Sequence, residues 1–107
     1  MEESAYIVLF ITTATVEEAQ QISKALLNQR KVACINIVPK VSSHFWWQGE
    51  LDSAKESLMV AKTKASQLNE IVRLVKELHS YEIPEIIALP IVGGNQDYLE
   101  WIDKEVK

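Results

Sequence analysis

Short stretches rich in β-branched and aromatic residues alternate along the chain with stretches of helical periodicity. The apolar stretches predict four strands, at residues 5–11, 32–38, 56–63 and 85–92. Pro39 should end the second strand. Residues 41–51 again look extended and lead to a turn within residues 49–55, which predicts a long hairpin.

Helical spacing of apolar residues marks two longer helices and a short one at the C-terminus. Thr15 and Glu18 have capping-box spacing, so the first helix should begin after Thr15. Arg30 and Lys31 are expected in its last turn, and Ser66 is expected to cap the second helix. The three apolar stripes comprise Val16, Ala19, Ile22 and Leu26, then Leu68, Ile71, Val72, Val75 and Leu78, then Tyr98, Leu99, Trp101 and Ile102.

The order of these elements is βαββαβ, followed by a C-terminal helix. Two right-handed βαβ-like halves place both helices on one face of a four-stranded antiparallel sheet. The predicted class is therefore α+β, a ferredoxin-like sandwich with an extended hairpin, in one domain that spans residues 1–107.

Three of the four strands are apolar on both faces, where an exposed sheet face would alternate with polar residues. A chain of 107 residues has no further layer for the second face. Self-association is the simplest way to cover it.

Composition excludes several classes. A net charge of −4 argues against general nucleic-acid binding. The single cysteine, Cys34, excludes an intramolecular disulfide. The acidic start, residues 1–3, does not resemble a signal peptide, and no apolar run approaches the ~20 residues of a membrane span. The expected compartment is the cytoplasm.

The segment before the last strand holds the strongest candidate site, because His79, Tyr81, Glu82 and Glu85 follow one another there. An ordinary helix-to-strand joint, with a histidine favoured by the helix dipole, explains the pattern equally well. Pro84 breaks any helical register between His79 and Glu85.

Metal and catalytic motifs are weak. The chain has no CxxC, HxxxH or HExxH spacing, no GxSxG and no phosphate-binding glycine loop. Cys34 is a small core hydrophobe or a soft-metal ligand. A metal site would need carboxylates, Met59 or ligands from several subunits. Trp46, Trp47 and Trp101 are expected at interfaces, although aromatic rings could also stack on a planar ligand.

Five motifs together resemble the CutA divalent-cation-tolerance proteins. They are ACINIVP at residues 33–39, FWWQGEL at 45–51, AKT at 61–63, HSYEIPEIIALPI at 79–91 and NQDYLEWI at 95–102. The resemblance implies a ferredoxin-like fold and tight homotrimers resembling PII signalling proteins. It also implies a link to copper and divalent-metal tolerance in bacteria, whereas animal members are associated with anchoring acetylcholinesterase.

The resemblance also implies roles for particular residues, which line clefts between subunits in the family's trimers. By position, the family's polar residues correspond to Cys34, Lys62, His79, Tyr81, Glu82 and Glu85. Ser80 departs from the family pattern, which has proline there, and this relaxes the backbone at the cleft rim.

The resulting hypothesis is a homotrimeric, non-enzymatic protein that binds copper or another divalent cation between subunits. Cys34, His79 and Glu85 are the expected metal ligands, and Lys62, Tyr81 and Glu82 are expected in the ligand cleft. No organic cofactor, nucleic acid or membrane is expected, and an unknown protein partner could read the bound state. The alternatives are a PII-like small-molecule sensor, an enzyme using His79 and Glu85, and an assembly scaffold without a ligand.

Overall fold

The computed structural model describes residues 4–107, so the acidic start at residues 1–3 and the signal-peptide prediction made there lie outside the described residues. The elements follow the predicted order. They are β1 (Tyr6–Thr13), α1 (Val16–Asn28), β2 (Cys34–Trp47), β3 (Glu50–Lys64), a 3₁₀ turn η1 (Ala65–Gln67), α2 (Leu68–Leu78), β4 (Ile86–Pro90) and α3 (Gln96–Glu105).

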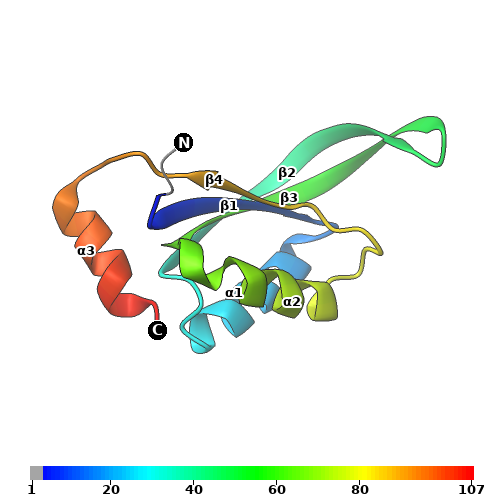
Figure 1. The fold of residues 1–107 in the computed structure, drawn as a ribbon. Helices are drawn as coiled ribbons and strands as arrows, with labels where there is room; N and C mark the ends of the chain where they lie inside the picture. Colours follow the sequence, from blue (N-terminus) through cyan, green and yellow to red (C-terminus); the bar gives the residue numbers. More distant parts are fainter. Residues whose placement is uncertain (1–3) are drawn as a thin grey trace.

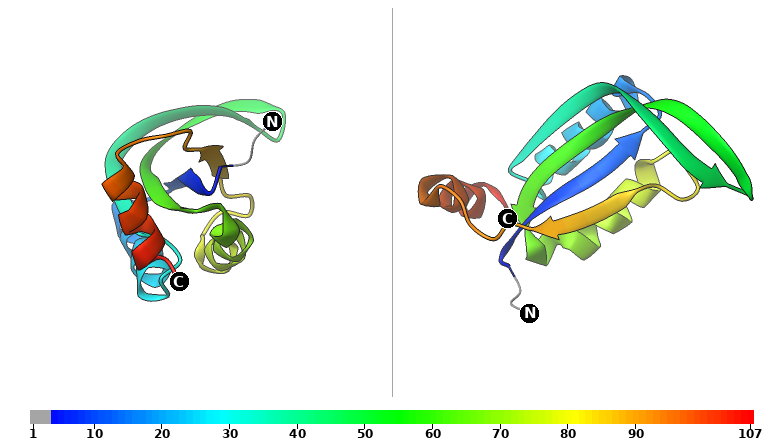
Figure 2. Two further views of the ribbon diagram at one scale, coloured as in Figure 1. Left: turned by 60° about the vertical axis from the view of Figure 1, so that its left-hand side comes forward. Right: turned by 90° about the horizontal axis from the view of Figure 1, so that it is seen from above.

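The four strands form one antiparallel sheet in the order β2-β3-β1-β4. Helices α1 and α2 lie side by side on one face of it, and α3 lies beyond the end of the sheet (Figures 1 and 2). The predicted antiparallel α+β arrangement is thereby confirmed.

The main core lies between the sheet and the two helices. Ile7, Leu9 and Ile11 alternate along β1 and face the helices, because side chains two residues apart share a face of a strand. Ile22 of α1 and Val75 of α2 pack into the same cluster. A smaller cluster fixes α3 through Leu99, Ile102 and Val106.

The opposite face of the sheet carries the apolar residues that the sequence placed there. Val8 and Phe10 of β1 lie on this face and pair with Leu89 and Ile87 of β4. Within one chain Ile87 is 51% exposed and Leu89 is 42% exposed, since α1 and α2 cover only the other face. We call this set of four the open sheet face.

Strands β2 and β3 extend together past the sheet as a long two-stranded arm (Figure 1). The prediction that Pro39 ends the strand is wrong, because β2 continues through it with an irregular register between Val38 and Val41. Lys40 there has a φ of 59°. A bulge accommodates a proline that cannot donate to the ladder.

The turn at the tip of the arm is shorter than the predicted residues 49–55. Trp47 pairs with Glu50, so only Gln48 and Gly49 form the loop. Both have positive φ, 51° and 81°, as a two-residue type I′ turn requires. Glycine adopts this conformation without a steric penalty. The two-residue turn then fixes the register in which β2 and β3 pair along the arm.

The predicted helix caps are partly correct. The Thr15 side chain accepts a hydrogen bond from the Glu18 amide, as predicted. Arg30 and Lys31 lie beyond α1, which ends at Asn28, and Arg30 instead pairs with Glu105 at 2.9 Å. Ser66 lies inside η1 and does not cap α2, because the 3₁₀ turn runs directly into that helix.

Candidate functional site

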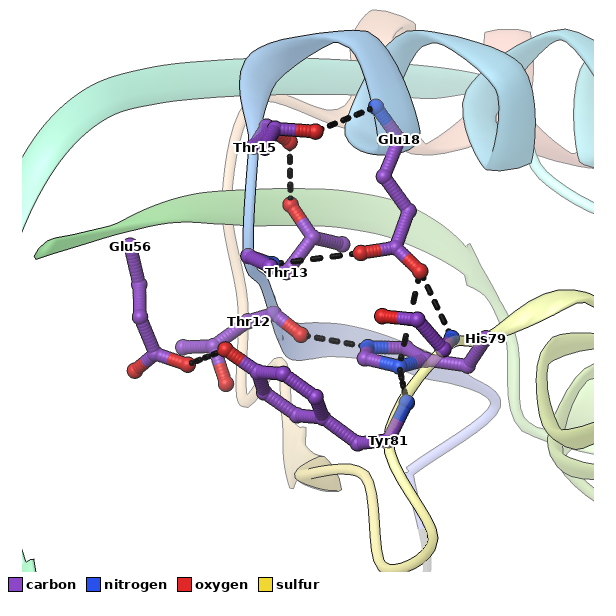
Figure 3. A network of polar contacts seen from close by, with 9 residues as sticks. Thr12, Thr13, Thr15, Glu18, Glu56, His79 and Tyr81 are labelled. Carbon is purple, nitrogen blue, oxygen red and sulfur yellow. Dashed lines mark hydrogen bonds and ion pairs between the residues drawn. The ribbon is translucent and has the colours of Figure 1, made fainter. Parts of the chain in front are cut away.

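His79 ends α2 and connects that helix to β1. Its side chain is fully buried, and its Nδ1 accepts a hydrogen bond from the Tyr81 amide at 3.0 Å. An acceptor Nδ1 requires the proton on Nε2, which donates to the Thr12 carbonyl at 2.7 Å (Figure 3). Both ring nitrogens are therefore used by the backbone, and His79 holds the loop after α2 against β1.

Glu18 joins the start of α1 to the same loop. Its Oε1 accepts from the Ala14 amide at 3.2 Å and its Oε2 accepts from the Ser80 amide at 2.7 Å. Burial alone would raise the pKa of the Glu18 carboxyl, but the hydrogen bonds from Ser80 and Ala14 outweigh it and lower this pKa. The carboxylate therefore holds the backbone of Ser80 against the start of α1.

Tyr81 reaches across the network to β3. Its hydroxyl donates to Glu56 Oε2 at 2.7 Å, and its ring lies 4.8 Å from that of His79. Burial, followed by the hydrogen bond to Glu56, raises the pKa of Tyr81 to about 12. The phenol thus remains a neutral donor to Glu56, a residue that is only 8% exposed.

A groove of about 830 Å³ opens between this loop and the arm. It is bounded by the loop after α2, the end of β1, and facing stretches of β2 and β3. Its lining comprises Thr12, Ser43, His44, Phe45, Trp46, Trp47, Asp52, Glu56, Ser80, Tyr81, Glu82, Ile83 and Glu85. We call it the acidic groove, because this lining holds four carboxylates and, over residues 4–107, neither lysine nor arginine.

The groove brings together one part of the predicted site. Tyr81, Glu82 and Glu85 line it, and so do Trp46 and Trp47 from the arm. His79 is not part of the lining and lies in the hydrogen-bond network that positions the loop.

Cys34 and Lys62 lie together elsewhere, paired across β2 and β3. Lys62 Nζ is 3.9 Å from Cys34 Sγ and also donates to Asn36. Burial and the neighbouring Cys34 raise the pKa of Tyr98, whose ring lies 5.3 Å from that of Trp101.

Strand register separates this pair from the groove. Lys62 pairs with Val8, and Thr12 is four residues further along β1. That spacing corresponds to about 13 Å of strand. The predicted ligands Cys34 and Glu85 therefore belong to different regions of one chain.

The carboxylates and the His44 imidazole are donor types that divalent metals accept. Within residues 4–107, however, no three His, Cys, Asp or Glu side chains lie close enough together to hold a metal ion.

Sequence reasoning did not assign three ionisable residues of the groove lining to the site. His44 and Asp52 lie on the arm, and Glu56 lies at the start of the apolar part of β3. An acidic residue that opens an otherwise apolar strand was the available signal for Glu56. His44 and Asp52 could be placed at the groove only from the pairing of β2 with β3 in the arm.

The chain also matches known proteins over most of its length. A sequence model described as "CutA1 divalent ion tolerance protein" matches residues 7–105. Over residues 4–107 no helix is long and apolar enough to cross a membrane.

Two relatives are named divalent-cation tolerance protein CutA. The one from Archaeoglobus fulgidus is 41% identical over 92% of this chain and 96% of its own length. The one from Thermus thermophilus is 44% identical over 89% of this chain and 92% of its own length. The chain spans 57% of a chloroplastic CutA 1 from Oryza sativa subsp. japonica, at 38% identity.

Solved structures agree with the fold. The Thermus thermophilus divalent cation tolerance protein superposes with a TM-score of 0.93 at 41% identity, covering 95% of this chain and 99% of that one. A CutA from Archaeoglobus fulgidus, described as periplasmic, gives a TM-score of 0.92 at 40% identity over the same shares. The chain therefore belongs to the CutA1 divalent ion tolerance protein family.

Proposed function

We propose that this chain is a homotrimeric tolerance protein that binds copper or another divalent cation at clefts formed when the acidic groove meets a neighbouring subunit. The observation that supports this most is the charge of the groove. Four carboxylates line it and, within the described residues, no lysine or arginine offsets them. Such a surface attracts cations and repels anions.

Two features of the single chain support the participation of a neighbouring subunit. One chain offers no cluster of three ligands among residues 4–107, so we expect further donors from another copy. The open sheet face, with Ile87 51% exposed, gives the copies an apolar surface to bury. Trp46, Trp47 and Trp101 are proposed as anchors of the same contacts.

Within the groove we assign the metal to Glu85 together with His44, which supply oxygen and nitrogen donors. Such a set favours Cu(II) over Zn(II), Co(II) and Mn(II) by the Irving–Williams order. Cys34 is a separate thiol site beside Lys62, and a soft thiolate there would take Cu(I). His79 acts indirectly, by holding the loop that carries Glu85.

Calorimetric titration with Cu(II) tests this assignment. Glu85→Gln should weaken binding about ten-fold or more, because it removes a charged ligand. Cys34→Ser should leave Cu(II) binding unchanged. Glu77→Gln on the exposed side of α2 is the matched control, since it removes the same charge at a residue that does not line the groove. Equal Cu(II) affinity in Glu85→Gln and the parent would contradict the assignment.

A PII-like metabolite sensor is the alternative function. The acidic lining favours it only for cationic metabolites, because nucleotides and other anions would be repelled. We place the protein in the cytoplasm as a prediction, which cell fractionation with an antibody against the chain would check.

A further inference from the structure

We propose that His79 is a proton-sensitive switch: a second proton on its imidazole releases the loop of residues 80–85, which forms one wall of the acidic groove. The inference goes beyond the proposed metal site, because it concerns the hydrogen bonds that hold the loop and applies to a chain without a metal. Three features carry it: the tautomer of His79, the position of the Glu18 carboxylate, and the connection of the loop to the groove.

The imidazole of His79 has no free position for a second proton. Its side chain is fully buried, its Nε2 donates to the Thr12 carbonyl at 2.7 Å, and its Nδ1 accepts from the Tyr81 amide at 3.0 Å. The second proton must go to Nδ1, because Nε2 already carries one, and both nitrogens of an imidazolium are donors. Two donors would then face each other, so the hydrogen bond from the Tyr81 amide is lost.

Glu18 is the group that can accept from the new donor. Its Oε2 lies 3.8 Å from His79 Nδ1 and accepts from the Ser80 amide at 2.7 Å (Figure 3). Burial raises the pKa of Glu18, but the hydrogen bonds from Ser80 and Ala14 outweigh it and lower this pKa, so Glu18 is a carboxylate where an imidazole takes up a proton. An imidazolium–carboxylate hydrogen bond is about 2.8 Å long, and its formation draws Oε2 away from Ser80. One proton thus acts on two consecutive amides of the loop.

The other groups around His79 connect the switch to the groove. The Tyr81 ring lies 4.8 Å from the imidazole, and its hydroxyl donates to Glu56 of β3 at 2.7 Å. From β1 the imidazole meets only the uncharged carbonyl of Thr12 among its hydrogen-bond partners in residues 4–107. Loss of the Tyr81 amide bond therefore loosens the contact between Tyr81 and Glu56, and with it the wall of the groove.

Nuclear magnetic resonance of the metal-free full chain between about pH 8 and about pH 5 tests the proposal, because an imidazole takes up its second proton in this range. The resonances of the His79 ring and of the Ser80 and Tyr81 amides should change with one common midpoint. Below it, and after correction for the intrinsic pH dependence of exchange, hydrogen-exchange protection of both amides should fall about ten-fold, as expected for the loss of one hydrogen bond each.

Three variants locate the switch. His79→Gln keeps a donor and an acceptor but takes up no proton in this range, so the change in both amides should disappear. Glu18→Gln keeps an acceptor for the Ser80 amide without the charge, so it should move the midpoint to lower pH, and it covers the case in which His79→Gln fails to fold. Glu17→Gln, an exposed neighbour in the same turn, should keep the midpoint of the parent. A purely architectural role of His79 would give no midpoint that depends on Glu18.

Three results would overturn the switch: amides that do not respond while the imidazole titrates, an imidazole that stays neutral down to about pH 5, or equal midpoints in Glu18→Gln and the parent. Titration of the parent with Cu(II) at about pH 8 separates the switch from the metal function. A protein that shows the amide transition without binding copper keeps the switch and loses the metal proposal. Copper binding without the transition does the reverse.

Discussion

At the scale of single residues, His79 shows how a group typical of metal sites can serve the architecture. Its imidazole lies between the Thr12 carbonyl and the Tyr81 amide, and both nitrogens are occupied. The equally weighted explanation from the sequence, a histidine at a helix-to-strand joint, agrees with this position. A neutral imidazole can donate a hydrogen bond from one ring nitrogen and accept one at the other, which explains why a histidine suits this position.

Replacing His79 with alanine should lower the free energy of unfolding by about 2–4 kcal/mol, since it leaves a cavity and two unpaired backbone groups. Urea denaturation measures the change. The matched control is His44→Ala, because His44 is the other histidine and its side chain is exposed. An unfolding free energy of His79→Ala equal to that of the control would refute the structural role.

At the scale of elements, Glu18 connects the first turn of α1 to the loop between α2 and β4. The sequence predicted only the local half of this role, the cap at Thr15. The contact with the Ser80 amide spans 62 positions, so the folded arrangement of both helices creates it.

Stability should depend on pH through Glu18. Its pKa is lowered in the folded chain, because the hydrogen bonds from the amides of Ser80 and Ala14 outweigh the effect of burial. The stabilisation is complete at pH values above the pKa of Glu18 in the unfolded chain. It is lost as the pH falls through the lower pKa that Glu18 has in the folded chain.

Unfolding free energies measured from neutral pH down into the acid range should therefore fall less steeply in Glu18→Gln than in the parent. The control is Glu17→Gln, an exposed neighbour in the same turn. Parallel pH profiles for Glu18→Gln and the parent would show that the contact contributes nothing.

At the scale of the whole molecule, the open sheet face and the long arm are the features that one chain leaves uncovered. An apolar strand such as β4 on an exposed face is typical of a surface that binds another subunit. A stable contact of this kind buries about 1,000 Å² or more.

We expect light scattering to give three times the mass of one chain. Ile87→Lys should shift the protein toward monomers, because it places a charge in the proposed contact while remaining compatible with the single chain, where Ile87 is half exposed. Gln20→Lys on the exposed side of α1 adds the same charge elsewhere and should stay trimeric. A parent protein of monomer mass, or a trimeric Ile87→Lys, would contradict the trimer.

The sequence determined the class and order of the elements, because periodicity and capping are local properties: β1, α1 and the Thr15 cap all follow from adjacent residues. It also determined that the sheet would be apolar on both faces. Tertiary structure decided the length of the arm, since the bulge after Pro39 and the two-residue turn at Gly49 depend on pairing between β2 and β3. It likewise decided the site. Glu56 lies on β3 and His44 on β2, whereas Glu85 lies in the loop before β4, and only the folded sheet and loop bring these side chains to one groove, while the same fold separates Cys34 from it.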